Sequence, residues 1–156
     1  MYHNLEEIKD KIDSAINSFL TNEKDLFEID SNERTISQNF STYLKPIFPE
    51  WDVDCDYNRD MKNIKKLEIK GEIKSIYTDI SIHHRESQEN YIVIEIKKSP
   101  PHSISNKKVK ANLKRLQKMT SDDKYHYKYG LFALFYVKEK SGKNPILIYY
   151  QNGKEV

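Results

Sequence analysis

The chain has 156 residues, of which 37% are hydrophobic and 32% are charged, and its formal net charge is +2. This length suits one globular domain with its own core, and no apolar run approaches the ~20 residues of a membrane-spanning helix. The single cysteine, Cys55, excludes an internal disulfide and a thiolate zinc cluster. The N-terminal segment is acidic and amphipathic, unlike a signal peptide. We therefore expect a soluble protein of the reducing cytoplasm.

The first half of the chain predicts two helices and then a strand. Apolar residues recur at spacings of three and four over residues 3–20, and again over about 31–47, as in amphipathic helices. Residues 51–59 alternate between apolar and polar side chains, as in a strand. We interpret the polar face of this strand as solvent-exposed; it carries Asp52, Asp54 and Asp56.

Glu33 lies on the apolar face of the second predicted helix. It precedes Ile36 by three residues and Phe40 by seven, so it projects from the same side. A carboxylate on an inward face is unusual unless something there needs it. Two interpretations stay open. Asp30 followed by Glu33 fits a capping box, in which Glu33 binds the backbone at the helix start; alternatively, Glu33 serves a site beneath the helix.

Residues 77–98 predict an antiparallel β-hairpin in which Asp79 lies opposite Glu95. Successive side chains of a strand point to opposite faces, so Asp79, Glu95 and Lys97 share one face. The other face carries a row of isoleucines: Ile80, Ile82, Ile92, Ile94 and Ile96. Opposed Cβ atoms lie ~4.5–5.5 Å apart, and two carboxylates that close repel unless a cation separates them or one binds a proton. The alternative is a cross-strand salt bridge on an exposed sheet face.

The rest of the chain predicts a helix over about 103–119 and strands at 130–137 and 145–150. A helix between two strands is what a right-handed crossover between parallel strands requires. The element order is thus helix, helix, strand, hairpin, helix, strand, strand. This order predicts an α/β sandwich built on a mixed sheet.

The charged residues are unevenly distributed. Residues 99–121 contain six basic side chains and no acidic one: Lys107, Lys108, Lys110, Lys114, Arg115 and Lys118. Exposed helix faces usually mix both signs, so this segment predicts a phosphate-binding face, because contacts to a nucleic-acid backbone need charge without a sequence pattern. An ordinary solvated helix face is the alternative.

Two further sets of residues have simpler interpretations. His83 is expected opposite Tyr91, near the loop end of the hairpin, as a surface histidine; a phosphate contact is its alternative. Tyr125, Tyr127 and Tyr129 are interpreted as strand packing, with stacking on bases as the alternative.

Asp79 and the sequence Glu-Ile-Lys at 95–97 place two carboxylates and an ammonium on one sheet face. Mg²⁺ prefers hard oxygen ligands, and an ammonium stabilises the charge that develops when a phosphodiester is attacked. This pattern and the order of elements resemble the PD-(D/E)XK nuclease superfamily, with Thr78 in place of the proline. The stretches NERTISQNFSTYLKPIF and WDVDCDYNR, followed by the hairpin, are also similar to small uncharacterised bacterial proteins assigned to that superfamily.

The resemblance implies a restriction-endonuclease-like three-layer sandwich, with a mixed central sheet flanked by helices. It would form a single domain over residues 1–156, in which the helix at 3–20 packs on a core of about 25–150. The implied activity is that of a metal-dependent deoxyribonuclease using Mg²⁺, or Mn²⁺ in its place.

The resemblance also assigns roles to four residues and one backbone carbonyl. Asp79 and Glu95 would be the metal ligands, with the backbone carbonyl of Ile96 as a third. Lys97 would orient or activate the attacking water, and Glu33 would be an auxiliary ligand or would hold a metal-bound water.

The expected partner is nucleic acid, DNA in the first place, and not a membrane. So small a domain has little surface for reading bases, so a second copy of the chain or a specificity partner would supply sequence recognition. Two alternatives to the enzyme remain: a nucleic-acid-binding module without chemistry, and a protein-interaction domain whose charges only solvate the sheet.

Overall fold

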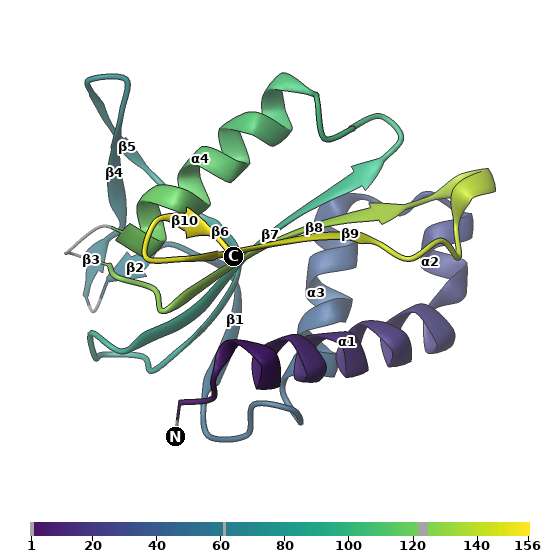
Figure 1. Ribbon diagram of the computed structural model, residues 1–156, viewed down its shortest axis with the longest axis horizontal. Coiled ribbons are helices and arrows are strands. Elements are labelled where there is room, and N and C mark those ends of the chain that lie inside the picture. Colours follow the sequence, from purple (N-terminus) through teal and green to yellow (C-terminus); the bar gives the residue numbers. More distant parts are fainter. Residues whose placement is uncertain (1, 61, 122–124) are drawn as a thin grey trace.

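The computed structural model describes residues 2–60, 62–121 and 125–156. A six-stranded mixed sheet lies at its centre, with the strand order β1-β6-β7-β8-β9-β10. Three N-terminal helices pack on one face of this sheet and α4 packs on the other (Figure 1). The predicted mixed α/β architecture is therefore confirmed. Within the described residues, no helix has both the length and the apolar character needed to cross a membrane.

The N-terminal helices are α1 (Leu5–Asn22), α2 (Lys24–Glu28) and α3 (Glu33–Leu44). The sequence predicted α1 and α3 but not α2. The side chain of Asn4 accepts the N–H of Glu7, and the Glu7 side chain accepts the N–H of Asn4, so a complete capping box starts α1.

The strands of the central sheet are β1 (Asp52–Tyr57), β6 (Thr78–His83), β7 (Asn90–Ser99), β8 (Tyr129–Tyr136), β9 (Ile146–Gln151) and β10 (Lys154–Glu155). Only β7 and β8 run parallel among these neighbours. The crossover between them contains α4 (Lys107–Ser121), as the sequence predicted.

Two small antiparallel sheets lie outside the central one. They pair β2 (Arg59–Asp60) with β3 (Asn63–Ile64), and β4 (Lys66–Ile69) with β5 (Glu72–Ser75). A 3₁₀ helix, Lys138–Lys140, follows β8.

Each face of the sheet has its own apolar core. The five isoleucines of the hairpin are at most 1% exposed and pack toward α1 and α3. In that core the Phe135 ring lies 5.8, 5.5 and 5.8 Å from the rings of Phe19, Phe27 and Phe40. On the opposite face, Val93 packs with Leu116 of α4. The odd-numbered face of the hairpin therefore lies under α4.

The hairpin register is the predicted one from Ile80 opposite Ile94 to Ile82 opposite Ile92. Beyond Ile82 the register shifts, and His83 pairs with Asn90 instead of Tyr91. An extra residue in one strand of a pair is a β-bulge, which turns the following side chains. Tyr91 consequently packs in the α1-side core, where its hydroxyl accepts the N–H of His3 at 2.7 Å.

His83 is not a surface histidine, contrary to the sequence-based interpretation. It is 2% exposed, and its Nε2 lies 2.9 Å from Oδ2 of Asp54. Asp54 also forms a two-point ion pair with Arg85. The interpretation of the three β1 aspartates as a solvated face is thus wrong for Asp54, which pairs with Arg85 in the loop after β6. It holds for Asp56, which is exposed.

The tyrosines before β8 pack inside the protein, as interpreted: Tyr125, Tyr127 and Tyr129 are at most 2% exposed. The Tyr127 hydroxyl lies 2.9 Å from that of Ser81 and accepts a hydrogen bond from Lys65. These contacts hold the segment before β4 against the central sheet.

Candidate active site

The predicted site lies where β6 and β7 part. Their ladder reaches Ile80 and Ile94, and β7 continues beyond it. There the Asp79 Oδ2 accepts the N–H of Ile96 at 2.7 Å. Two residues further along β7, a Glu33 carboxylate oxygen accepts the N–H of Lys98 at 3.0 Å. Backbone N–H groups away from water need an acceptor, so these two carboxylates take the place of a neighbouring strand.

Glu33 comes from the first turn of α3 and not from a capping box. Asn32 is the N-cap, and its side chain accepts the N–H of Thr35 at 2.8 Å. Asp30, the predicted cap, has a φ of 58° and pairs with Lys98 at 2.8 Å. The capping interpretation of Glu33 is therefore wrong, and its carboxylate instead reaches β7.

Glu95 lies at the centre of the site. It is 2% exposed; its Oε2 accepts a hydrogen bond from Asn112 Nδ2 at 2.9 Å, whereas its Oε1 accepts none. Burial raises the pKa of Glu95 to about 8, and the charge of Asp79 adds to that rise, while Arg115 and Lys97 oppose it. The expected alternative, a salt bridge on an exposed sheet face, does not fit so buried a carboxylate.

Asp79 shares these surroundings. Burial raises its pKa above the usual range, and the charge of Glu33 adds to the effect, whereas the hydrogen bond from Ile96 and the charge of Lys97 lower it. Lys97 Nζ lies 3.3 Å from Oε1 of Glu33. The structure thus brings together the four side chains that the sequence singled out, in one electrostatically coupled group.

Three contacts to this group were missed: one from His102, whose Nε2 lies 3.8 Å from Oε2 of Glu33, and two from α4. Asn112 donates to Glu95, and Nη2 of Arg115 lies 3.2 Å from the Glu95 Oε1. The sequence offered one signal for Asn112, a polar side chain between Val109 and Leu116 on the buried stripe of α4. The sequence-based prediction placed Arg115 on the nucleic-acid-binding face. The prediction is wrong for this residue, because its side chain points inward to Glu95.

The remaining five predicted phosphate contacts are exposed: Lys107, Lys108, Lys110, Lys114 and Lys118. Lys118 also donates to the carbonyl of Glu68 in the β4–β5 hairpin. The exposed face of α4 is therefore strongly basic, as the sequence predicted.

The oxygen ligands that this site offers are of the kind that Mg²⁺ prefers. Among the described residues, however, no three His, Cys, Asp or Glu side chains lie close enough together to form a metal-binding group. Mg²⁺ often takes one or two carboxylates and keeps several waters. Asp79 and Glu95 supply these, and the Glu95 Oε1 is a buried oxygen without a hydrogen bond. The N–H and C=O of one strand residue point to the same edge, so the Ile96 carbonyl lies on the edge that Asp79 contacts.

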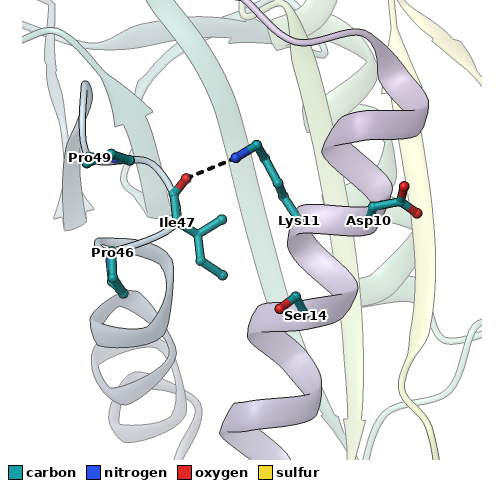
Figure 2. A pocket seen from close by; sticks show the side chains of 6 residues that line it. All are labelled: Asp10, Lys11, Ser14, Pro46, Ile47 and Pro49. Atoms are coloured by element: carbon teal, nitrogen blue, oxygen red, sulfur yellow. Dashed lines mark hydrogen bonds between the residues drawn. The ribbon is translucent and has the colours of Figure 1, made fainter.

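A cavity of about 480 Å³ lies elsewhere, between α1 and the segment after α3 (Figure 2). Its lining consists of Asp10, Lys11, Ser14, Pro46, Ile47 and Pro49. Lys11 reaches across it to the carbonyl of Ile47 at 3.4 Å (Figure 2). This lining shares no residue with the carboxylate group at β7.

Comparisons with known proteins add no assignment: no protein-family model matches the chain, and no curated protein or solved structure matches it significantly.

Proposed function

We propose that the chain is a metal-dependent nuclease of the PD-(D/E)XK type, which hydrolyses DNA phosphodiester bonds on a restriction-endonuclease-like three-layer fold. The observation that carries this proposal is the state of Glu95. Asp79 and Glu33 have a structural task, because they cap N–H groups of β7. Glu95 is buried beside another carboxylate and leaves one oxygen without a hydrogen bond. Such an arrangement costs stability and is typical of functional sites.

Asp79, Glu95 and the Ile96 carbonyl hold the metal in this proposal. Mg²⁺, when bound there, supplies Lewis-acid stabilisation of a phosphate oxygen and a bound water of lowered pKa. Lys97 places its ammonium beside these ligands, orients the attacking water and stabilises the negative charge that develops on the phosphate. Glu33 holds Lys97 in place through their 3.3 Å contact.

The exposed lysines of α4 bind the substrate backbone. α4 follows β7 in the chain and covers the face from which Glu95 projects. Lysines along such a helix neutralise phosphates whatever the base sequence. Sequence recognition, where present, then comes from a second copy or a partner protein, and the protein acts in the cytoplasm.

A second candidate is a nucleic-acid-binding module without chemistry. Arg115 favours it, because a guanidinium 3.2 Å from Glu95 Oε1 already supplies a positive charge to that carboxylate. In both candidates DNA affinity falls with salt, with log K decreasing by about 0.9 per log unit of salt for each phosphate contact. Affinity that does not respond to salt contradicts both.

The test is cleavage of supercoiled plasmid and of single-stranded RNA with Mg²⁺ or Mn²⁺. We expect wild type to nick or linearise the plasmid and Asp79→Asn to lose this activity. Asp56→Asn is the matched control, since Asp56 is exposed on β1. Wild type that binds DNA with salt dependence but cleaves neither substrate with either metal would support the binding module and contradict the nuclease.

A further inference from the structure

We propose that Arg115 is an exchangeable counter-cation of the site: it neutralises Glu95 in the metal-free protein, yields that carboxylate to a divalent metal ion, and then contacts a substrate phosphate. This inference rests on the proposed metal site, but it assigns Arg115 a role that the exposed lysines of α4 do not share.

Arg115 contacts the site through one nitrogen, Nη2. Its Nη2 lies 3.2 Å from Glu95 Oε1 and donates to the Tyr77 carbonyl at 2.6 Å. Its Nε is buried without a hydrogen bond. A guanidinium can form a two-point contact with a carboxylate, and Arg115 forms only a one-point contact here. Withdrawal into water would satisfy the Nε–H, and the side chain is already 25% exposed.

A metal ion and Arg115 compete for the same oxygen of Glu95. A ligand bond to Mg²⁺ is about 2.1 Å long, and the Arg115 nitrogen lies 3.2 Å from the same carboxylate oxygen. The two cations would then be at most about 5 Å apart on a buried group, where like charges repel strongly. Binding of one therefore disfavours the other.

The opposite side of the Glu95 carboxylate is held by a neutral group. Asn112, three residues before Arg115 on α4, donates to Glu95 Oε2 at 2.9 Å. An amide keeps this contact whether the other oxygen faces a guanidinium or a metal. Asn112 thus orients the carboxylate in both states, while Arg115 exchanges.

The released guanidinium stays near the substrate path. Arg115 follows Lys114, and Lys118 lies one turn further along the same helix; both are exposed. Outward rotation of the Arg115 side chain therefore adds a charge to the basic face only when metal is bound. Metal and nucleic acid then favour each other's binding, since such coupling is reciprocal.

The first test measures Mn²⁺ affinity by the electron paramagnetic resonance signal of the free ion, without nucleic acid. We expect Arg115→Met, which keeps most of the aliphatic stem, to bind Mn²⁺ at least tenfold more tightly than wild type. Lys24→Ala on α2 removes an exposed charge far along the chain and should change the affinity less than twofold. Equal or weaker Mn²⁺ binding by a folded Arg115→Met and a folded Arg115→Ala would overturn the inference.

Two controls separate failure of the inference from failure of the proposed function. The first control is Glu95→Gln, whose loss of Mn²⁺ binding would show that wild type binds the ion through Glu95. If it does so and Arg115→Met binds Mn²⁺ no more tightly than wild type, only the inference fails. Should wild type and both Arg115 variants bind no Mn²⁺, the metal site and the inference both fail.

The second test measures the affinity for a short DNA duplex by fluorescence anisotropy, with and without Ca²⁺, and verifies that the duplex stays intact. Without metal we expect Arg115→Met and wild type to bind DNA equally, because Arg115 is then held by Glu95. With Ca²⁺ we expect wild type to gain at least threefold in affinity and Arg115→Met to gain less. An equal gain in both proteins would contradict the phosphate contact.

Discussion

Replacing Glu95 by glutamine should stabilise the metal-free protein, although it removes a proposed metal ligand. Glutamine has nearly the same shape and can still accept the hydrogen bond from Asn112. It carries no charge, so it avoids the cost of keeping a carboxylate in a buried site next to Asp79. A residue selected only for stability would show the opposite effect.

The magnitude follows from the pKa of Glu95, which burial raises from 4.5 to about 8. Each unit corresponds to about 1.4 kcal/mol, so the carboxylate costs at most about 5 kcal/mol of folding free energy above pH 8. That pKa already includes the attraction of Arg115 and Lys97 for the carboxylate, so we expect a net stabilisation of a few kcal/mol, and at most about 5 kcal/mol, at pH 8.5. The unfolded chain releases the proton at lower pH than the folded one, so the wild-type cost grows from about pH 4.5 to about pH 8.

The assay is urea unfolding in EDTA at pH 5, 7 and 8.5, with Glu72→Gln on the exposed β5 as control. The free-energy difference between Glu95→Gln and wild type should widen with pH, whereas the control should stay within about 0.5 kcal/mol of wild type. A Glu95→Gln variant that is less stable than wild type at pH 8.5, or whose difference does not change with pH, would refute the reasoning.

The remaining predictions concern α3 and β1. Asn32→Ala and Asn4→Ala each remove a helix N-cap, and each should lower the free energy of unfolding in urea by about 1 kcal/mol. Only Asn32→Ala should also slow metal-dependent cleavage, because Glu33 is the first residue of α3. Equal cleavage rates in the two variants would contradict a role for Glu33. Burial lowers the pKa of His83, and its hydrogen bond to Asp54 opposes this shift, so its contribution to stability is full above pH ~6.5 and is lost as pH falls below that value. His83→Gln should therefore flatten the fall in thermal midpoint between pH 7 and 5, and an unchanged slope would contradict this account.

The sequence predicted the site through a simple periodicity. Because side chains alternate along a strand, the positions of Asp79, Glu95 and Lys97 in the sequence place them on one face of the predicted hairpin. The isoleucines on the other face favour the same register, since a slip by one residue would turn the charged set into the apolar core under α1 and α3.

What the sequence did not predict depends on contacts between distant segments. The shift that pairs His83 with Asn90 arises at the hairpin's loop end, where no alternation pattern constrains the pairing. Arg115 entered the list of phosphate contacts because charge alone defined that list. Its inward direction depends on how α4 docks over β7, which composition and spacing along one helix do not specify.

The cap of α3 shows a third limit. Asp30, Ser31 and Asn32 are all good N-cap residues, and the spacing from Asp30 to Glu33 favoured the wrong one. The ion pairs of Asp30 with Lys98 and Lys138 decide the matter in the folded protein. Those partners are too far away in sequence for any local pattern to reveal.

Plasmid cleavage by Lys97→Ala, compared with Lys98→Ala, tests the nuclease proposal most directly. The two lysines are neighbours on β7, but Lys97 contacts Glu33 in the site whereas the Lys98 side chain pairs with Asp30. With Mg²⁺ we expect wild type and Lys98→Ala to convert supercoiled plasmid at similar rates, and Lys97→Ala to be slower by ~100-fold or more, as for loss of a group that stabilises transition-state charge. Cleavage by Lys97→Ala at the wild-type rate, or the absence of cleavage by wild type, would contradict the proposal.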